Sequence, residues 1–146
     1  MGLPLRVLFI DDSDDDVAFL VQVLRNGDYE VTFERVHNAD LMSQRLYLKK
    51  WDVIISAYHM PDFCALTAYV LIHLRHPRMP FLVVSDSLSL DLRIAAAKVG
   101  IPSGNYIVKD NLARELLPAI ERVLQAQANQ KGDPVRTVGD EASPTQ

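Results

Sequence analysis

Cysteine is scarce in this sequence, and long apolar runs are absent. The single cysteine, Cys64, excludes an internal disulfide framework and fits a reducing compartment. No apolar run approaches the ~20 residues that a membrane-spanning helix requires. Lysine and arginine, 15 residues against 19 acidic ones, gather in no stripe along the chain, so we expect no direct binding to nucleic acid. These absences predict a cytoplasmic protein without membrane contact.

The residues that are present are typical of one globular domain. The chain has 146 residues, of which 49% are hydrophobic and 23% charged, and this is enough to bury a single core. Four short apolar runs are nearly continuous, as in strands that are covered on both faces. Residues 30–36 alternate in part and suit an edge strand. The four continuous runs are residues 5–10, 53–56, 81–84 and 106–108.

Helical spacing fills the gaps between these runs. Val17, Leu20, Val21 and Leu24 repeat on one helical face, and Gly27 follows as a C-terminal cap. Strands that alternate with helices predict an α/β fold, a doubly wound (βα)5 unit with a five-stranded parallel sheet and helices on both faces. The four later helices are expected at residues 41–49, 65–75, 90–99 and 112–126.

The C-terminal segment, residues 127–146, differs in composition from the rest of the chain. It is polar and rich in Gln, Asn, Gly, Pro, Ser and Thr. Such a segment cannot bury enough apolar surface to order itself. We interpret it as a disordered tail or a linker, which leaves residues 1–126 as the one domain.

Polar residues follow the expected strands at their carboxyl ends. Ligands of open α/β sheets bind beyond these ends, so the polar residues there form the candidate site. We expect two carboxylates, a hydroxyl and an ammonium to converge on one crevice, next to an alanine that ends the third strand. These residues are Asp11 and Asp12, Ser85, Lys109 and Ala57 respectively.

The acidic run that starts at Asp11 divides into two parts. Ser13 is a good N-cap residue, and Asp16 three positions later completes a variant of the capping box. Residues 14–16 then occupy the first turn of a helix, where negative charge is favourable, so we expect them to have a structural role. Asp11 and Asp12 precede the helix, and adjacent acids repel each other unless a cation relieves them. We therefore predict a functional role for this pair.

Together, the strand ends resemble the receiver domains of two-component response regulators. The resemblance covers about residues 5–126 and rests on four segments in the order and spacing of the family: LFIDDSDDD, DVIISAYHMP, FLVVSDS and YIVKDN. It implies a flavodoxin-like receiver fold and a role in phosphorelay signalling, not catalysis. It also implies a protein partner, either a histidine kinase or an output domain. Dimers through the fourth and fifth helices are common in the family, so a dimer is an option here.

The resemblance assigns phosphate-contacting and switching roles to three residues. Ser85 matches the hydroxyl that senses the phosphoryl group. Lys109 matches the lysine that contacts phosphate and balances its charge. Tyr106 matches the aromatic switch residue that turns inward when phosphate is present. These three positions agree with the family pattern.

The resemblance also implies a Mg²⁺ site, and here the sequence departs from the family. Asp12 matches the acid that binds the metal directly, Asp11 the acid that binds it through water, and the backbone carbonyl of His59 the remaining protein ligand. Ala57 stands where the family has its phosphoacceptor aspartate. A methyl group has no lone pair, so it can neither accept phosphate nor bind metal. We expect weak Mg²⁺ binding at most, and no required cofactor.

Two further departures lie close to this site. Asp86 follows the hydroxyl position, where the family usually has alanine or glycine, and we expect its side chain to point into solvent. Asp110 replaces a proline that many members carry after the lysine. The second departure affects the local loop and not the fold.

Three hypotheses about function remain open at this point. The first is a degenerate receiver that binds a partner through its fourth helix, fifth strand and fifth helix without phosphate. The second is an ordinary receiver whose aspartate at position 57 was replaced by alanine through engineering. The third is a phosphatase of the haloacid dehalogenase type, with Asp12 as nucleophile and Asp14 as general acid; it lacks the further acidic motif of such enzymes.

Two histidines and a tryptophan are interpreted as structural. His73 and His76 lie three positions apart on one expected helix, but no second pair of ligands is visible, so we expect both to face solvent. Trp51 precedes the third strand and is expected to pack at the opposite end of the sheet from the acidic pair.

Overall fold

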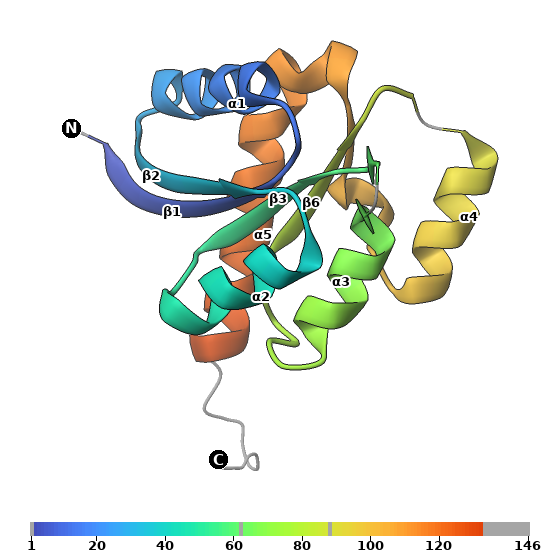
Figure 1. Ribbon diagram of the computed structural model, residues 1–146. Coiled ribbons are helices and arrows are strands. Elements are labelled where there is room, and N and C mark those ends of the chain that lie inside the picture. The colour runs from blue at the N-terminus through green and yellow to red at the C-terminus, as the bar shows by residue number, and fades with distance from the viewer. Residues whose placement is uncertain (1, 62, 88, 133–146) are drawn as a thin grey trace.

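Five parallel strands form the central sheet in the computed structural model, which describes residues 2–61, 63–87 and 89–132 (Figure 1). Their order across the sheet is β2-β1-β3-β6-β7, and every neighbouring pair is parallel. The predicted five-stranded parallel α/β fold is thereby confirmed, with the partly alternating strand β2 at an edge. The strands are β1 (Leu3–Ile10), β2 (Tyr29–Val36), β3 (Val53–Ala57), β6 (Phe81–Ser85) and β7 (Tyr106–Val108).

Helices cover both faces of the sheet, as the continuous apolar strands require. Two helices lie on one face and three on the other (Figure 1). The first pair is α1 (Asp14–Asn26) and α5 (Leu112–Gly132); the other three are α2 (Ala39–Leu48), α3 (Ala65–His73) and α4 (Leu90–Val99).

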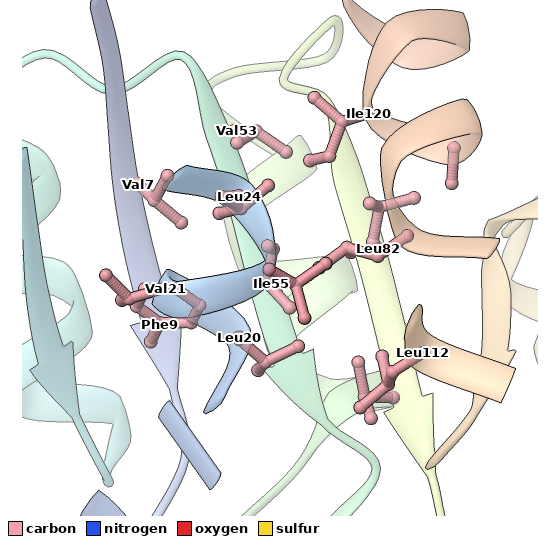
Figure 2. Packing of buried hydrophobic residues seen from close by; sticks show 14 of the residues in the cluster. Val7, Phe9, Leu20, Val21, Leu24, Val53, Ile55, Leu82, Leu112 and Ile120 are labelled. Atoms are coloured by element: carbon pink, nitrogen blue, oxygen red, sulfur yellow. The ribbon is translucent and has the colours of Figure 1, made fainter. Parts of the chain in front are cut away.

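The core consists of two apolar layers that the sheet separates. Side chains of a strand alternate between its two faces, so Val7 and Phe9 pack under α1 and α5, whereas Leu8 packs under the other three helices. Figure 2 shows part of the first layer, to which α1 contributes Leu20 and α5 contributes Ile120. All the strands therefore lie between two layers of helices, with their carboxyl ends at one edge.

A short antiparallel hairpin follows β3, and no sequence pattern indicated it. Its strands are β4 (His59–Met60) and β5 (Phe63–Cys64), with His59 opposite Cys64. Met60 and Phe63 are buried and join the core layer under α3, which begins directly after the hairpin.

Helix ends largely follow the sequence signals. The Ser13 hydroxyl accepts a hydrogen bond from the Asp16 N–H at 3.2 Å, which confirms the N-cap of α1. Gly100 ends α4 with a φ of 99°, the left-handed conformation that glycine adopts without strain. Gly27 ends α1 as predicted but has a φ of −90°, and the left-handed residue is Asp28. Gly27 also leaves room for α5, because a Cβ there would require the Leu117 side chain to shift.

Two helix ends differ from the prediction. α3 ends at His73, and turns continue from there to His76, whose N–H donates to the Ile72 carbonyl at 2.8 Å. α5 runs to Gly132, past the predicted end at residue 126, with Pro118 inside it. Alanine and glutamine extend this helix because both have high helix propensity, which the polar composition concealed. The remainder of the predicted tail, residues 133–146, lies outside the described residues.

The predicted exposure of His73 is wrong. Its ring is half-buried and stacks on Tyr69, with 3.9 Å between the ring centres. Nδ1 lies 2.8 Å from the Tyr69 carbonyl oxygen, and Nε2 lies 2.9 Å from the Met79 carbonyl oxygen. The ring therefore ties the end of α3 to the loop that enters β6.

No helix in the described part of the chain is long and apolar enough to cross a membrane.

The conformation of Gly100 generates a stability prediction. Gly100→Ala should lower the free energy of unfolding by about 1 kcal/mol, because a Cβ is strained in the left-handed region. Gly100→Asn should lose less, since asparagine tolerates this conformation. Urea melts of the three proteins measure both losses. If alanine and asparagine are equally well tolerated, the left-handed cap does not limit the stability of α4.

Candidate functional site

The carboxyl ends of four strands bring the predicted site residues to one edge of the sheet. Ile10 lies beside Ser56, so Asp11 follows β1 next to the end of β3, where Ala57 lies beside Val84 of β6. The next pairing joins Ser85 to the last residue of β7, directly before Lys109. The parallel register thus forms the predicted crevice, which we call the acid crevice. Its members are Asp11, Asp12, Asp16, Ala57, Ser85, Asp86 and Lys109.

Lys109 forms the ion pairs of the acid crevice. Its Nζ lies 2.9 Å from Oδ2 of Asp16 and 3.1 Å from Oδ1 of Asp86. The hydrogen bond to Asp16 is the main cause that raises the pKa of Lys109, and Asp86 adds to it while burial opposes it. The ammonium is therefore fixed by two carboxylates of the chain itself.

Asp16 is the site residue that the sequence analysis missed. We predicted that it would complete a capping box, but the Ser13 N–H donates to Oδ1 of Asp11 at 2.9 Å instead. The carboxylate of Asp16 is thereby available to Lys109, 93 positions away in the chain. No local sequence pattern reports such a pair; only the fact that α1 and η2 (Lys109–Asn111) both begin at this edge of the sheet could have indicated it.

Asp86 also differs from its prediction. Its side chain is 87% exposed, as expected of a residue that points into solvent, yet it binds Lys109. An exposed ion pair of this kind contributes little to stability. Its effect is local: it places a second negative charge against the ammonium from the β6 side of the crevice.

Asp11 and Asp12 have different environments although they are adjacent. Asp11 is 4% exposed, and burial raises the pKa of its carboxyl, against the hydrogen bond from the Ser13 N–H. Its backbone carbonyl accepts a hydrogen bond from Arg35 at 3.0 Å. Asp12 is exposed. A cavity of about 190 Å³ lies beside Asp11, Asp16 and Lys109, towards α1 and α5.

The remaining acids of the run lie away from the crevice centre. Oδ1 of Asp14 lies 2.7 Å from Nε of Arg35 on β2, so its carboxylate is paired with this edge strand and not with Lys109. Asp15 is exposed in the first turn of α1. Both agree with the structural role that we predicted for this part of the run.

The residues present do not fit the Mg²⁺ site that the resemblance implies. In the described residues, no group of three or more His, Cys, Asp or Glu side chains is placed to hold a metal ion. Ala57 offers only a methyl group between Asp11 and Ser85. His59, the predicted backbone ligand, lies in the β4–β5 hairpin with its side chain exposed. We therefore derive no chemical step through a metal at this site.

Ser85, which ends β6, and Tyr106, which begins β7, are both buried. The Ser85 hydroxyl donates to the Ser87 carbonyl at 2.8 Å, within its own loop. The Tyr106 ring is turned inward and is 8% exposed, and burial raises the pKa of its hydroxyl to about 12. Its Oη has no hydrogen-bond partner in the part of the chain that the structure describes.

Burial of Asp11 generates a prediction about pH. Because its folded pKa is raised above the ordinary value of 3.8, the folded state holds this proton after the unfolded chain has lost it. The contribution of Asp11 to stability therefore decreases as pH rises from 3.8 through the raised pKa, and above that range the cost of burying the charge is complete. Asp11→Asn should raise the free energy of unfolding at pH 7 by about 1 kcal/mol.

The gain of Asp11→Asn should vanish below the ordinary pKa, where the carboxyl is protonated in both states. Urea melts at several pH values measure it. Asp12→Asn removes an exposed carboxylate at the next position and is the matched control, with a smaller gain in the free energy of unfolding expected at pH 7. Equal effects of the two substitutions would contradict the role of burial.

The structure is similar to many solved receiver domains. The signal receiver domain of an HD domain-containing protein from Pseudomonas fluorescens Pf-5 is 25% identical, with a TM-score of 0.73, over 86% of this chain and 98% of the other. A CheY-like response regulator receiver domain protein from Methanospirillum hungatei JF-1 is 23% identical, with a TM-score of 0.73, over 88% and 99%. The receiver domain of a histidine kinase from Syntrophus aciditrophicus is 19% identical, with a TM-score of 0.72, over 92% and 98%.

Comparison by sequence gives no such match. No family model matches it, and no curated protein does. The likeness therefore lies in the order of the strands and the placing of the helices, which the structural comparison detects at low identity. The chain has the five-stranded α/β fold of CheY-like receiver domains.

Proposed function

We propose that this chain is a receiver-like signalling domain that accepts no phosphate and acts by binding another protein. The observation that carries the proposal is Ala57, which ends β3 between Asp11 and Ser85. Phosphoryl transfer to this position requires a nucleophilic oxygen in line with the donor. A methyl group supplies none, and no neighbouring residue can activate it.

The charges of the acid crevice support the same proposal. A phosphoryl group at this site would need the Lys109 ammonium as a counter-charge, but Asp16 and Asp86 already bind that ammonium. The Ser85 hydroxyl is bonded to the Ser87 carbonyl. The groups that the family directs at phosphate are thus satisfied by the chain itself, and this fits a domain that works without the modification.

The proposed partner is a histidine kinase or an output domain in the cytoplasm, with no nucleic acid bound by this chain. α4 offers apolar surface for such a partner: Leu90 is 70% exposed and Ile94 is 46% exposed. The surface formed by α4, β7 and α5 is therefore the proposed contact, and a dimer of the chain would use the same surface.

The alternative is a phosphoaccepting receiver that was inactivated by an engineered Asp-to-Ala change at position 57. The presence of Asp11, Asp12, Ser85 and Lys109 favours it, because all the supporting residues of the family are in place. Asp86 favours the degenerate receiver of the first hypothesis, because its carboxylate already binds the ammonium of Lys109. The phosphatase hypothesis gains no support, because the proposed general acid, Asp14, is paired with Arg35.

The proposed function predicts that the chain takes no phosphate. Incubation with Mg²⁺ and acetyl phosphate, followed by intact mass measurement, should give no phosphoryl adduct, because position 57 has no nucleophile. Ala57→Asp is the positive comparison, and Ala57→Asp with Asp86→Ala tests whether freeing Lys109 raises the yield. An adduct on the unsubstituted chain, mapped to any aspartate of the crevice, would refute the proposal.

Restoring the carboxylate should also change stability. Ala57→Asp adds a negative charge beside Asp11 in a crevice whose ammonium is already paired, and we expect a loss of about 1 kcal/mol in metal-free buffer. Mg²⁺ should recover this loss in the variant by binding the folded state alone. Urea melts with and without Mg²⁺ measure both effects, and Ala57→Asn, which adds no charge, is the control. If Ala57→Asp is as stable as the unsubstituted chain without metal, and Mg²⁺ does not change its stability, the crevice has lost more than its nucleophile.

A further inference from the structure

A groove of about 550 Å³ lies between the C-terminal halves of α2 and α3. These helices are neighbours on one face of the sheet (Figure 1). Met42 of α2 is buried at its floor, and Leu46 is half-buried beside it. The walls expose apolar side chains: Tyr47 of α2 is 87% exposed, and Leu71 and Leu74 are 41% and 76% exposed.

A second cavity of about 490 Å³ adjoins the groove at the C-terminal end of α2. Leu46, Tyr47 and His76 line both. The second cavity reaches Trp51, which precedes β3, so it lies at the amino ends of the strands and opposite the acid crevice. We call the two together the α2–α3 groove, lined by Met42, Leu46, Tyr47, Trp51, Leu71 and Leu74.

α3 is apolar on the side that faces away from the sheet as well as on the side that packs against it. Ala65, Ala68 and Ile72 are buried against the sheet, yet Val70 and Leu71 are also apolar and are 42% and 41% exposed. A helix that is apolar all round is normally covered on all sides. Single exposed apolar residues need no explanation, but a contiguous set beside a groove marks a binding surface.

The walls of the groove are held in place by hydrogen bonds. The Trp51 indole N–H donates to the Arg45 carbonyl at 3.1 Å, which fixes the end of α2. His73 ties the end of α3 to the Met79 carbonyl, as described above. A preformed groove loses less conformational freedom when it binds a ligand than a mobile one.

The rim of the groove is cationic although the chain as a whole is acidic. Its cations are Lys49, Lys50 and Arg75, and no aspartate or glutamate lines either cavity. Lys49 is bonded to Glu34 of β2. In the described ranges, Lys50 and Arg75 have no ion pair. Positive charges around an apolar groove favour a ligand with carboxylates at its edges.

We propose that the α2–α3 groove binds an amphipathic helix of a partner protein, with apolar residues on one face and glutamate or aspartate at its flanks. Helices that bind in grooves present apolar side chains at i, i+3, i+4 and i+7, which matches an apolar floor with positive side chains beside it. A second copy of the chain fits less well, because a two-fold contact through this groove would bring the positive charges of both copies into one interface. The groove is remote from the acid crevice, so the inference is independent of phosphate acceptance.

The first test uses designed peptides of roughly 15 residues, about four helical turns. One carries leucine at i, i+3, i+4 and i+7 with glutamate at the flanks; a second has lysine for glutamate, and a third is the acidic peptide scrambled. Trp51, the one tryptophan of the sequence, reports occupancy by fluorescence, and peptide anisotropy gives Kd. The acidic helix should bind at least about tenfold more tightly than the other two. No binding, or equal binding of all three, overturns the proposal.

The second test changes exposed groove residues, so that the fold is retained. Leu74→Ser should weaken the acidic peptide about tenfold, as expected for an apolar anchor. Leu90→Ser on α4 removes an equally exposed leucine outside the groove and should leave Kd unchanged. Urea melts establish that both variants are as stable as the unsubstituted chain.

Charge reversal tests the rim separately. Lys50→Glu with Arg75→Glu should invert the preference, so that the lysine peptide binds more tightly than the glutamate peptide. Arg93→Glu with Lys98→Glu reverses two exposed charges on α4 and should leave the preference for glutamate intact. An unchanged preference in the groove variant overturns the proposed partner chemistry. If the unsubstituted chain instead self-associates, and Leu74→Ser abolishes the self-association, the result overturns the proposed partner helix in favour of a second copy of the chain.

Discussion

Parallel pairing of all five strands is the constraint on which the rest of this structure depends. It places every strand's carboxyl end at one edge, so Asp11, Ala57 and Ser85 meet although they are far apart in sequence. It also requires a helix between consecutive strands, which covers both faces and makes the strands continuously apolar. The same geometry leaves the C-terminal halves of α2 and α3 at the opposite edge. The crevice and the groove are thus two consequences of one pairing pattern.

The positive charge of Lys109 in the acid crevice is balanced by carboxylates of the chain itself, without an anion from outside. Asp16 approaches Lys109 from α1 and Asp86 approaches it from the end of β6. Two half-exposed or exposed pairs contribute little stability individually, but they determine where the ammonium lies. Buried Asp11 lies close by with a raised pKa, so the crevice carries more acidic groups than its one lysine offsets. An added carboxylate at position 57 would increase this imbalance.

The sequence predicted the elements well because their signals are local. Apolar runs located the strands, Ser13 and Gly100 located helix ends, and the strand ends located the crevice. The failures involve contacts between distant segments. Asp16 has the pattern of a cap residue, and only the fold places Lys109 beside it. His73 lies half-buried because the loop before β6 returns to meet its ring. The β4–β5 hairpin has two-residue strands, too short for any periodicity to show.

A receiver that takes no phosphate differs from a switch in its energetics. A ligand shifts a two-state equilibrium only through its different affinity for the two states, so a domain without a phosphoryl group has nothing at the crevice to shift it. In the structure Tyr106 is buried, and the Ser85 hydroxyl is bonded within its own loop. Under the proposed function, the affinity of the chain for its partner does not depend on phosphate. The α2–α3 groove lies far from the acid crevice and suits a contact of constant strength.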